Sequence, residues 1–156
     1  MNKAPEHELQ KHCVTWFKYR YPHLKALFFS VPNGGVRNKA EAGKLKAEGT
    51  NRGVADLILL LPNYYFHSLN IEMKAGSSQS DYQKIYEQAC RASGSNYVIC
   101  RSLDQFKDVI QEYLSSVDVN IISSLRTLHA AVEEAKVQQA REHFIKLKNK
   151  KNHEEK

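Results

Sequence analysis

The sequence predicts an α/β fold in which helices flank a mixed central sheet. Short apolar runs typical of strands alternate with stretches of helical periodicity. Two of these runs follow each other after a short connection and can pair antiparallel, whereas the last follows a helix and can join the sheet by a crossover. A chain of 156 residues suits one compact domain with a short appendage.

The N-terminal part predicts a helix and then a strand. The helix is expected to begin near Pro5 and to end before Pro22, because apolar residues recur at helical spacing: Leu9, Cys13, Trp16 and Phe17. Residues 26–31 are apolar and run into the tight turn 32–35. They therefore predict a strand.

The middle of the chain predicts a short helix and two strands. Residues 38–48 are rich in Ala, Lys and Glu and form a helix that Gly49 can end. Residues 54–61 are almost wholly aliphatic, which is typical of a strand buried on both faces. Apolar and polar side chains alternate in residues 69–74, which indicates a strand with two distinct faces.

Two more helices, separated by a strand, follow in the next third of the chain. Residues 80–83 form a capping-box pattern that opens a helix lasting until Gly94. Residues 97–100 predict another short strand. Residues 102–105 form a second capping-box pattern, opening a helix that runs to about Leu114.

The region after Val117 differs in character. Apolar residues mark one stripe of a long helix: Ile121, Leu125, Leu128, Val132 and Ala135. This stripe needs a surface to bury it, either on a second copy of the chain or on its own domain. We therefore expect a core domain over residues 1–116, an amphipathic helix over 117–147 and a charged, mobile tail over 148–156.

Composition and charge restrict the function classes. No apolar run approaches the roughly 20 residues needed to span a bilayer, and residues 1–5 form no apolar signal core, so we expect a cytoplasmic protein. Three cysteines without CxxC spacing are expected to be reduced packing residues rather than a zinc site. The net charge of +6 predicts a polyanionic partner, nucleic acid or a membrane surface. Ten Lys or Arg against four acids between Lys3 and Arg52 make the first third of the chain the expected binding region.

Asp56 is anomalous among the aliphatic residues that follow it. Asp is depleted in strands, and an ionised carboxylate there costs several kcal/mol unless it is paired or bound to a metal. Taken alone, it reads as a turn residue that caps the loop 51–53. Glu72 and Lys74 change this interpretation, because they share one face of their strand. A hairpin between the two strands would bring Asp56 to the same point.

Such a pair of acids suits a metal ion. Two carboxylates with a backbone carbonyl and waters make an all-oxygen shell, which favours Mg²⁺ or Mn²⁺ over zinc. The metal would polarise a phosphodiester and lower the pKa of a bound water. Lys74 would orient the attacking water or offset charge in the transition state. The alternative is a surface pair between Glu72 and Lys74, which contributes less than about 1 kcal/mol.

The order of these segments resembles the PD-(D/E)XK nuclease superfamily and, within it, the VRR-NUC family. The matching segments cover about residues 6–114: Glu8, Pro32-Asn33-Gly34-Gly35 with Arg37, Gly49, Gly53-Val54-Ala55-Asp56, Ile71-Glu72-Met73-Lys74, and Ser80 with Gln83. Ala55 stands where the superfamily name leads one to expect proline, a position that shapes the backbone rather than the chemistry. The resemblance implies a restriction-endonuclease-like core of helix, three strands, helix and strand.

The resemblance also implies roles for the residues that match. Asp56 and Glu72 would be metal ligands, helped by the backbone carbonyl of Met73, and Lys74 would be catalytic. Gln83 would have two roles, as the capping-box acceptor and as the partner that fixes Lys74 or the water.

Other matching residues have two interpretations. The residues expected to contact DNA are Asn33, Gly34, Gly35, Arg37, Lys39 and Arg52. The turn 33–35 would donate backbone N–H groups to a phosphate, or it is a plain hairpin turn. Glu8 would approach the metal from the first helix, or it is a solvent-facing helix carboxylate. The aromatic residues 64–66 would stack on a displaced base, or they pack a loop onto the core.

The predicted function is hydrolysis of DNA phosphodiester bonds by a Mg²⁺- or Mn²⁺-dependent endonuclease. Stand-alone members of the family resemble phage-type Holliday-junction resolvases that act as dimers. Branched DNA is therefore the expected substrate, a homodimer the expected assembly, and the cytoplasm of a bacterial or phage-infected cell the expected location. The alternatives are a nicking or restriction-like nuclease on unbranched duplex and a catalytically silent DNA-binding module with the same fold. The intact Asp, Glu and Lys set favours catalysis, because a pure binder gains nothing from two acids facing phosphate.

Overall fold

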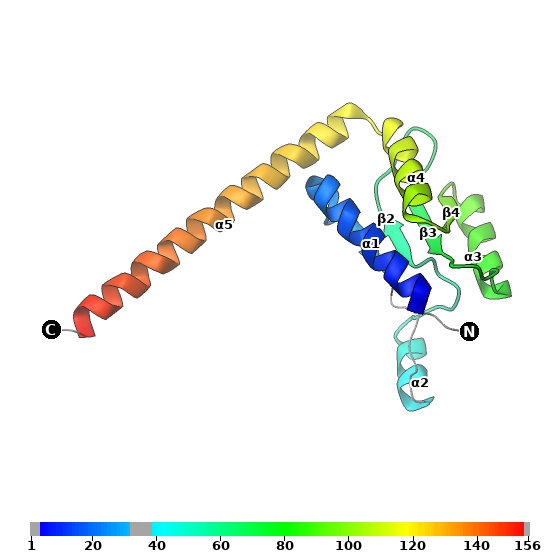
Figure 1. Ribbon diagram of the computed structural model, residues 1–156, viewed down its shortest axis with the longest axis horizontal. Helices are drawn as coiled ribbons and strands as arrows, with labels where there is room; N and C mark the ends of the chain where they lie inside the picture. The colour runs from blue at the N-terminus through cyan, green and yellow to red at the C-terminus, as the bar shows by residue number, and fades with distance from the viewer. Residues whose placement is uncertain (1–3, 32–38, 155–156) are drawn as a thin grey trace. The chain divides into compact units, whose positions relative to one another are not determined.

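The computed structural model describes residues 4–31 and 39–154, and the chain divides into the units Met1–Asp118 and Val119–Lys156. The first unit is built around a four-stranded sheet in the order β1-β2-β3-β4, of which β2, β3 and β4 are labelled in Figure 1. The strands are β1 (Phe28–Ser30), β2 (Leu57–Leu59), β3 (Leu69–Met73) and β4 (Asn96–Cys100).

The sheet is mixed, as predicted. β1, β2 and β3 pair antiparallel in succession, whereas β4 pairs parallel with β3 after a crossover through α3 (Asp81–Ala92). A parallel neighbour cannot be reached by a tight turn. The chain needs a longer crossover connection, and α3 supplies it. The order of helices and strands also matches the prediction for the first unit, which confirms the α/β fold class.

α1 (Ala4–Arg20) and α4 (Leu103–Ser115) cover one face of the sheet. The Phe17 ring of α1 stacks on Phe28 of β1 with centroids 4.0 Å apart, and Trp16 meets Phe106 of α4 edge-on. The buried residues on this side include Cys13, Leu57, Leu59, Leu69, Ile71, Met73, Cys100 and Ile110. Burying each large apolar side chain contributes about 1.5–3 kcal/mol, so this layer is the main source of stability.

α3 covers the other face, where the polar side chains of β3 point. Tyr86 of α3 donates a hydrogen bond to Asn70 Oδ1 over 3.0 Å, and its ring meets Tyr97 edge-on. All five residues of β3 are therefore buried, with one apolar face and one polar face. The predicted distinction between the faces is present, but both lie inside the protein.

The prediction that β2 is buried on both faces is wrong. Leu57 and Leu59 are buried, whereas Ile58 is half-buried and Leu60 is exposed. Among the strands, α3 packs mainly on β4, which is not adjacent to β2 in the sheet. The second face of β2 is consequently covered less completely.

The two predicted capping boxes differ. At α3 the Ser80 side chain and the Gln83 side chain each bind the other's backbone N–H, which is a full box. At α4 Ser102 Oγ accepts a hydrogen bond from Gln105 N over 3.1 Å, but Gln105 Oε1 accepts from Arg101 N. The Gln105 side chain reaches back one residue too far, so the second box is only half formed.

α1 and α2 (Lys39–Ala47) end where the sequence predicted. α1 stops before η1 (Pro22–Leu24), a 3₁₀ turn that begins at a proline. α2 precedes Gly49, whose φ of +93° is the left-handed conformation that glycine adopts most readily at a helix end. The three cysteines, Cys13, Cys90 and Cys100, are buried and free, as expected.

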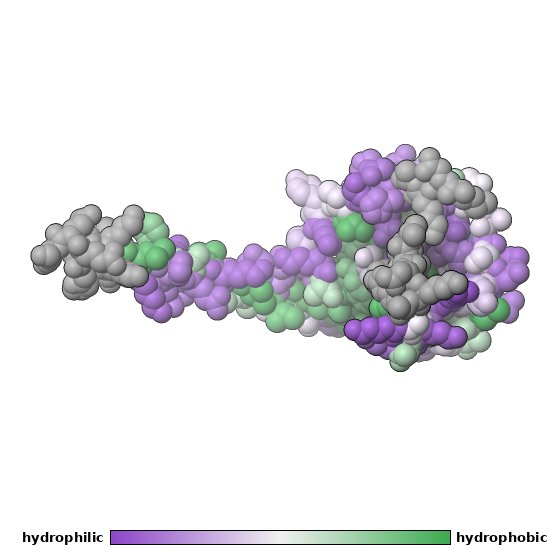
Figure 2. Space-filling view, turned by 90° about the horizontal axis from the view of Figure 1, so that it is seen from below, coloured by the Kyte–Doolittle hydropathy of each residue, from purple (hydrophilic) through white to green (hydrophobic). Residues whose placement is uncertain are grey.

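The second unit is one helix, α5 (Val119–Glu154), of 36 residues. Its backbone continues to Glu154, so the helix extends beyond residue 147, where the sequence predicted that a charged tail would begin. Hydrophobic side chains are interspersed with hydrophilic ones along α5 (Figure 2). None of the helices in the described part of the chain is both long and apolar enough to cross a membrane.

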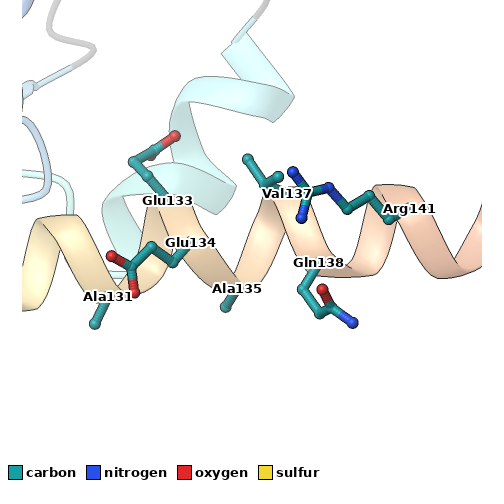
Figure 3. A pocket seen from close by; sticks show the side chains of 7 residues that line it. All are labelled: Ala131, Glu133, Glu134, Ala135, Val137, Gln138 and Arg141. Atoms are coloured by element: carbon teal, nitrogen blue, oxygen red, sulfur yellow. The ribbon is translucent and has the colours of Figure 1, made fainter.

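A shallow hollow along α5 is lined by this helix alone (Figure 3), and its residues are Ala131, Glu133, Glu134, Ala135, Val137, Gln138 and Arg141. A single helix cannot enclose a ligand, because ligand sites are concave on several sides. The hollow is therefore a groove in the surface of α5.

Candidate active site

The candidate site lies where β2 begins and β3 ends. In the antiparallel pairing of these strands, Leu57 is opposite Ile71. Extending this register by one residue places Asp56 opposite Glu72, and directly opposed side chains share a face of the sheet. Asp56 Oδ2 accepts a hydrogen bond from Met73 N over 2.9 Å, which fixes this carboxylate to the end of β3.

Glu72 has polar partners in α3, in β4 and at the residue that follows β3. Lys74 Nζ lies 3.0 Å from Glu72 Oε1, and Gln83 Nε2 of α3 donates a hydrogen bond to the same oxygen. Tyr97 Oη of β4 donates to Glu72 Oε2 over 3.4 Å. The exposed fraction is only 1% for Glu72 and 7% for Lys74. The pair is therefore not the surface ion pair that the sequence left as an alternative.

The electrostatics of the site favour a bound cation. The pKa of Glu72 is raised to about 7, first by burial and then by the neighbouring Asp56 carboxylate, against the opposing effect of Lys74. Burial also raises the pKa of Asp56, although the Met73 N–H and Lys74 oppose the shift. Two neighbouring carboxylates that resist ionisation are stabilised as anions when a positive ion lies between them.

The donor set fits a hard divalent ion. Among the described residues, no group of three or more His, Cys, Asp and Glu side chains comes together to hold a metal. The protein donors here would be the carboxylates of Asp56 and Glu72, with the backbone carbonyl of Met73 as the predicted third oxygen. Oxygen donors completed by water are what Mg²⁺ and Mn²⁺ prefer.

Gly53 allows α3 to approach the start of β2. Its φ is +82°, and a Cβ at this position would collide with the carbonyl group of Tyr82 and lie 2.8 Å from Gln83 N. Glycine permits both the left-handed conformation and the close approach. The backbone leading to Asp56 is thereby packed against Tyr82 and Gln83 in the first turn of α3.

Gln83 makes both kinds of interaction that the sequence suggested. Its Oε1 accepts a hydrogen bond from Ser80 N over 2.8 Å, which closes the capping box. Its Nε2 remains available and donates to Glu72. The side chain that Gln83 holds in the site is therefore Glu72 rather than Lys74.

The acid that α1 brings toward the site is Glu6 rather than the predicted Glu8. Glu6 Oε1 accepts hydrogen bonds from Ala75 N over 3.2 Å and from Ser77 Oγ over 2.6 Å, in the segment after β3. Its charge also contributes to the raised pKa of Asp56. Glu6 therefore holds this segment and lies within electrostatic reach of the acids.

Glu8 is exposed and pairs with Lys11 over 2.8 Å. Helical spacing explains the difference, because Glu6 lies seven residues before the buried Cys13 and shares its face. Glu8 lies off that face. The apolar stripe of α1 was thus a signal in the sequence that could have identified Glu6.

Tyr97 and Gln79 are partners of the site that sequence reasoning missed. Gln79 Nε2 donates to Tyr97 Oη over 3.5 Å and to Glu87 Oε2 over 2.8 Å. These bonds extend the hydrogen bonds of Glu72 outward to the surface of α3. No motif marks Tyr97, because a tyrosine in a short apolar strand is indistinguishable from an ordinary core residue.

The predicted DNA-binding residues are only partly described. Asn33, Gly34, Gly35 and Arg37 lie outside the described residues, and Lys39 is the first residue of α2. Arg52 is exposed, and its guanidinium carbon lies 5.7 Å from the centroid of the Tyr82 ring. Arg52 is thus the predicted phosphate-binding residue whose surroundings are defined.

The aromatic residues 64–66 lie in the connection between β2 and β3. Tyr64 and Tyr65 are exposed, so the interpretation that these two rings pack onto the core is wrong. Asn63 organises the turn: its Oδ1 accepts hydrogen bonds from Tyr65 N and Phe66 N. The Asn63 side chain thus fixes the backbone of the turn, and the rings of Tyr64 and Tyr65 lie in solvent.

Comparison with known proteins agrees with this fold. The structure is similar to a solved structure named "VRR_NUC domain protein", with a TM-score of 0.64 and 26% sequence identity over 76% of this chain and 94% of that chain. No family model matches the sequence, and no curated protein matches it. The likeness supports a VRR-NUC-type domain and a restriction-endonuclease-like arrangement of the mixed sheet and its helices.

Proposed function

We propose that this protein is a metal-dependent DNA endonuclease that hydrolyses phosphodiester bonds. The observation that carries the proposal is the convergence of the half-buried Asp56 with the buried Glu72 and Lys74 at the adjoining ends of β2 and β3. The likeness to a protein named for a VRR_NUC domain supports nuclease chemistry. The net charge of +6 supports a polyanionic substrate.

The residues of the site have three roles: holding the metal, acting on the attacking water or the transition state, and positioning Glu72. Asp56 and Glu72, with the Met73 carbonyl, would hold Mg²⁺ or Mn²⁺, and the bound ion supplies Lewis-acid activation of the phosphodiester. Lys74 orients the attacking water or offsets negative charge in the transition state. Gln83 and Tyr97 are positioning residues, because each holds one of the two oxygens of Glu72.

Branched DNA and a homodimer belong to the same proposal. The apolar stripe of α5 has successive spacings of four, three, four and three residues, which is the repeat of a coiled-coil seam: Ile121, Leu125, Leu128, Val132 and Ala135. Leu128 and Val132 are exposed in the single chain. A second copy would bury the stripe, and two-fold symmetry would place two active sites for paired incisions across a junction.

Cleavage of a panel of labelled DNAs tests the proposal. The panel contains a four-way junction, a flap, a fork and a linear duplex, each incubated with Mg²⁺, Mn²⁺ or EDTA. We expect ion-dependent cleavage that favours the junction, is lost in Glu72→Gln and persists in Glu8→Gln, a matched change at an exposed acid. If no DNA is cut with Mg²⁺ and none with Mn²⁺, the nuclease proposal is refuted. Equal cleavage of all four DNAs would refute the preference for branched DNA.

A further inference from the structure

Arg52 and Tyr82 form a cation–π pair at the rim of the candidate site, with 5.7 Å between the guanidinium carbon and the ring centroid. Tyr82 immediately precedes Gln83 in the first turn of α3. Adjacent side chains on a helix diverge by about 100°, so Gln83 can reach Glu72 while Tyr82 points elsewhere. The Tyr82 residue is 56% exposed even with Arg52 against its ring.

The backbone on both sides of this pair is fixed relative to the acids. Arg52 is joined to Gly53, which packs against the carbonyl group of Tyr82. The capping box holds the first turn of α3, and Gln83 ties the same turn to Glu72. The exposed ring is therefore held at a defined place beside the site.

We propose that Tyr82, with Arg52, is a stacking surface for an unpaired or displaced DNA base next to the phosphate that is cut. An aromatic ring with an open surface stacks on any base, and an arginine beside it adds attraction for nucleic acid. The inference rests on the proposed function, because that function supplies the DNA. It also specifies which feature of the DNA the site selects.

Selection follows from the geometry of duplex DNA. In an intact duplex, neighbouring bases cover both faces of each base, so a base reaches the ring only if it leaves the stack. Gaps and flaps contain single-stranded bases, which leave the stack at little cost. The alternative is that Tyr82 only packs against Arg52. That packing leaves more than half of the Tyr82 surface exposed to solvent, where a base can stack on it.

Equilibrium binding of the full chain in EDTA tests the inference without cleavage. The probes are a duplex with a short single-stranded gap that contains 2-aminopurine and the same duplex without a gap. The variants are Tyr82→Ala, Tyr82→Phe and Tyr65→Ala, which removes the exposed tyrosine that is the competing stacking position in the turn after β2. Circular dichroism verifies that each variant is folded.

We expect Tyr82→Ala to weaken binding to the gapped DNA by about 5- to 140-fold, the range for loss of one base–aromatic stack. Binding to the intact duplex should not change. Tyr82→Phe and Tyr65→Ala should bind both DNAs as the unchanged protein does. The 2-aminopurine fluorescence should be quenched by the unchanged protein and by Tyr82→Phe, but not by Tyr82→Ala.

Unchanged binding of Tyr82→Ala to the gapped DNA, or an equal loss on both DNAs, would overturn the stacking role. If Tyr65→Ala weakened binding to the gapped DNA as much as Tyr82→Ala, the placement of the stacking surface at Tyr82 would be overturned. The two proposals fail separately. A protein that cuts DNA without using Tyr82 retains only the nuclease proposal, and one that needs Tyr82 for gapped DNA but cuts nothing retains only the stacking surface.

Discussion

The ammonium group of Lys74 and the carboxylate of Glu72 are 3.0 Å apart, and both are shielded from solvent. A pair in this environment is costly to assemble and contributes little to stability, because desolvation offsets the Coulomb attraction. Its presence beside a second acid, Asp56, at the adjoining ends of β2 and β3 is explained better by chemistry than by folding.

Lys74→Ala should lower the cleavage rate by about 10²- to 10³-fold, because a group that offsets transition-state charge is worth that much in a shielded site. Single-turnover cleavage of the junction measures the loss. Lys84→Ala is the matched control, since Lys84 is exposed and pairs with Asp81 on the surface of α3. Equal rates for Lys74→Ala and the unchanged protein would remove Lys74 from the mechanism.

Asp56→Asn should abolish cleavage while the protein remains folded. The amide oxygen of Asn can still accept the hydrogen bond from Met73 N, so the change removes charge rather than shape. Calorimetric titration with Mn²⁺ should show a loss of metal affinity. In metal-free buffer the melting temperature should rise, because repulsion between Asp56 and Glu72 disappears. Retained cleavage by purified Asp56→Asn contradicts the assignment of this ligand.

The stability of the metal-free protein should fall as the pH rises from about 5 to 8. The folded state holds a proton on Glu72 up to a pKa of about 7, whereas the unfolded chain releases it near 4.5. Between these values unfolding releases a proton, so the free energy of unfolding decreases with pH and then levels off. The full difference is on the order of 3 kcal/mol.

Urea unfolding in EDTA at several pH values measures this decrease. Glu72→Gln cannot ionise and should flatten the profile, whereas Glu112→Gln, at an exposed acid of α4, should leave it unchanged. Stability that stays constant or increases between pH 5 and 8 in the unchanged protein would show that Glu72 ionises normally.

Arg52→Ala should weaken DNA binding across sequences and make it less dependent on salt. Removing the interaction with one phosphate reduces the slope of log affinity against log salt by about 0.9 on duplex DNA. Binding measured at several salt concentrations gives this slope, and Arg37→Ala should behave in the same way. A changed sequence preference with an unchanged slope would indicate base readout instead.

The full chain should be a dimer in light scattering, and a chain ending at Ser116 should be a monomer. The apolar stripe of α5 has the heptad spacing of a two-stranded seam, and a second copy of the helix would bury it. Val132→Asn places a polar group in the seam and should weaken the dimer. A monomeric full chain would refute the dimer, and a dimeric truncated chain would place its interface on the first unit.

Sequence reasoning reached most of the site because the acids break local patterns. Asp56 interrupts an aliphatic run, and Glu72 occupies a strand whose alternation fixes its face. Glu6 was missed because its position follows from the helical face it shares with Cys13, not from a motif. Tyr97 gave no signal, since its hydroxyl reaches Glu72 only when β4 pairs with β3.

The mistakes about whole elements have a similar cause. The aliphatic run at residues 54–61 records apolar content but not which helix covers each face of the sheet. The charged end of α5 lacks a clear apolar stripe, which places the expected helix end at residue 147, yet Lys, Glu and Gln are good helix formers and the helix continues to Glu154. Coverage and length depend on tertiary context, which local patterns do not contain.

The close packing at Gly53 means that activity can be lost without touching any polar group. One methyl group there would push the first turn of α3 away from the sheet and separate Gln83 from Glu72. A single base change converts a glycine codon to an alanine codon, so a random mutagenesis screen for inactive clones should recover this position beside the acids. Such clones would carry every expected catalytic side chain and still be silent.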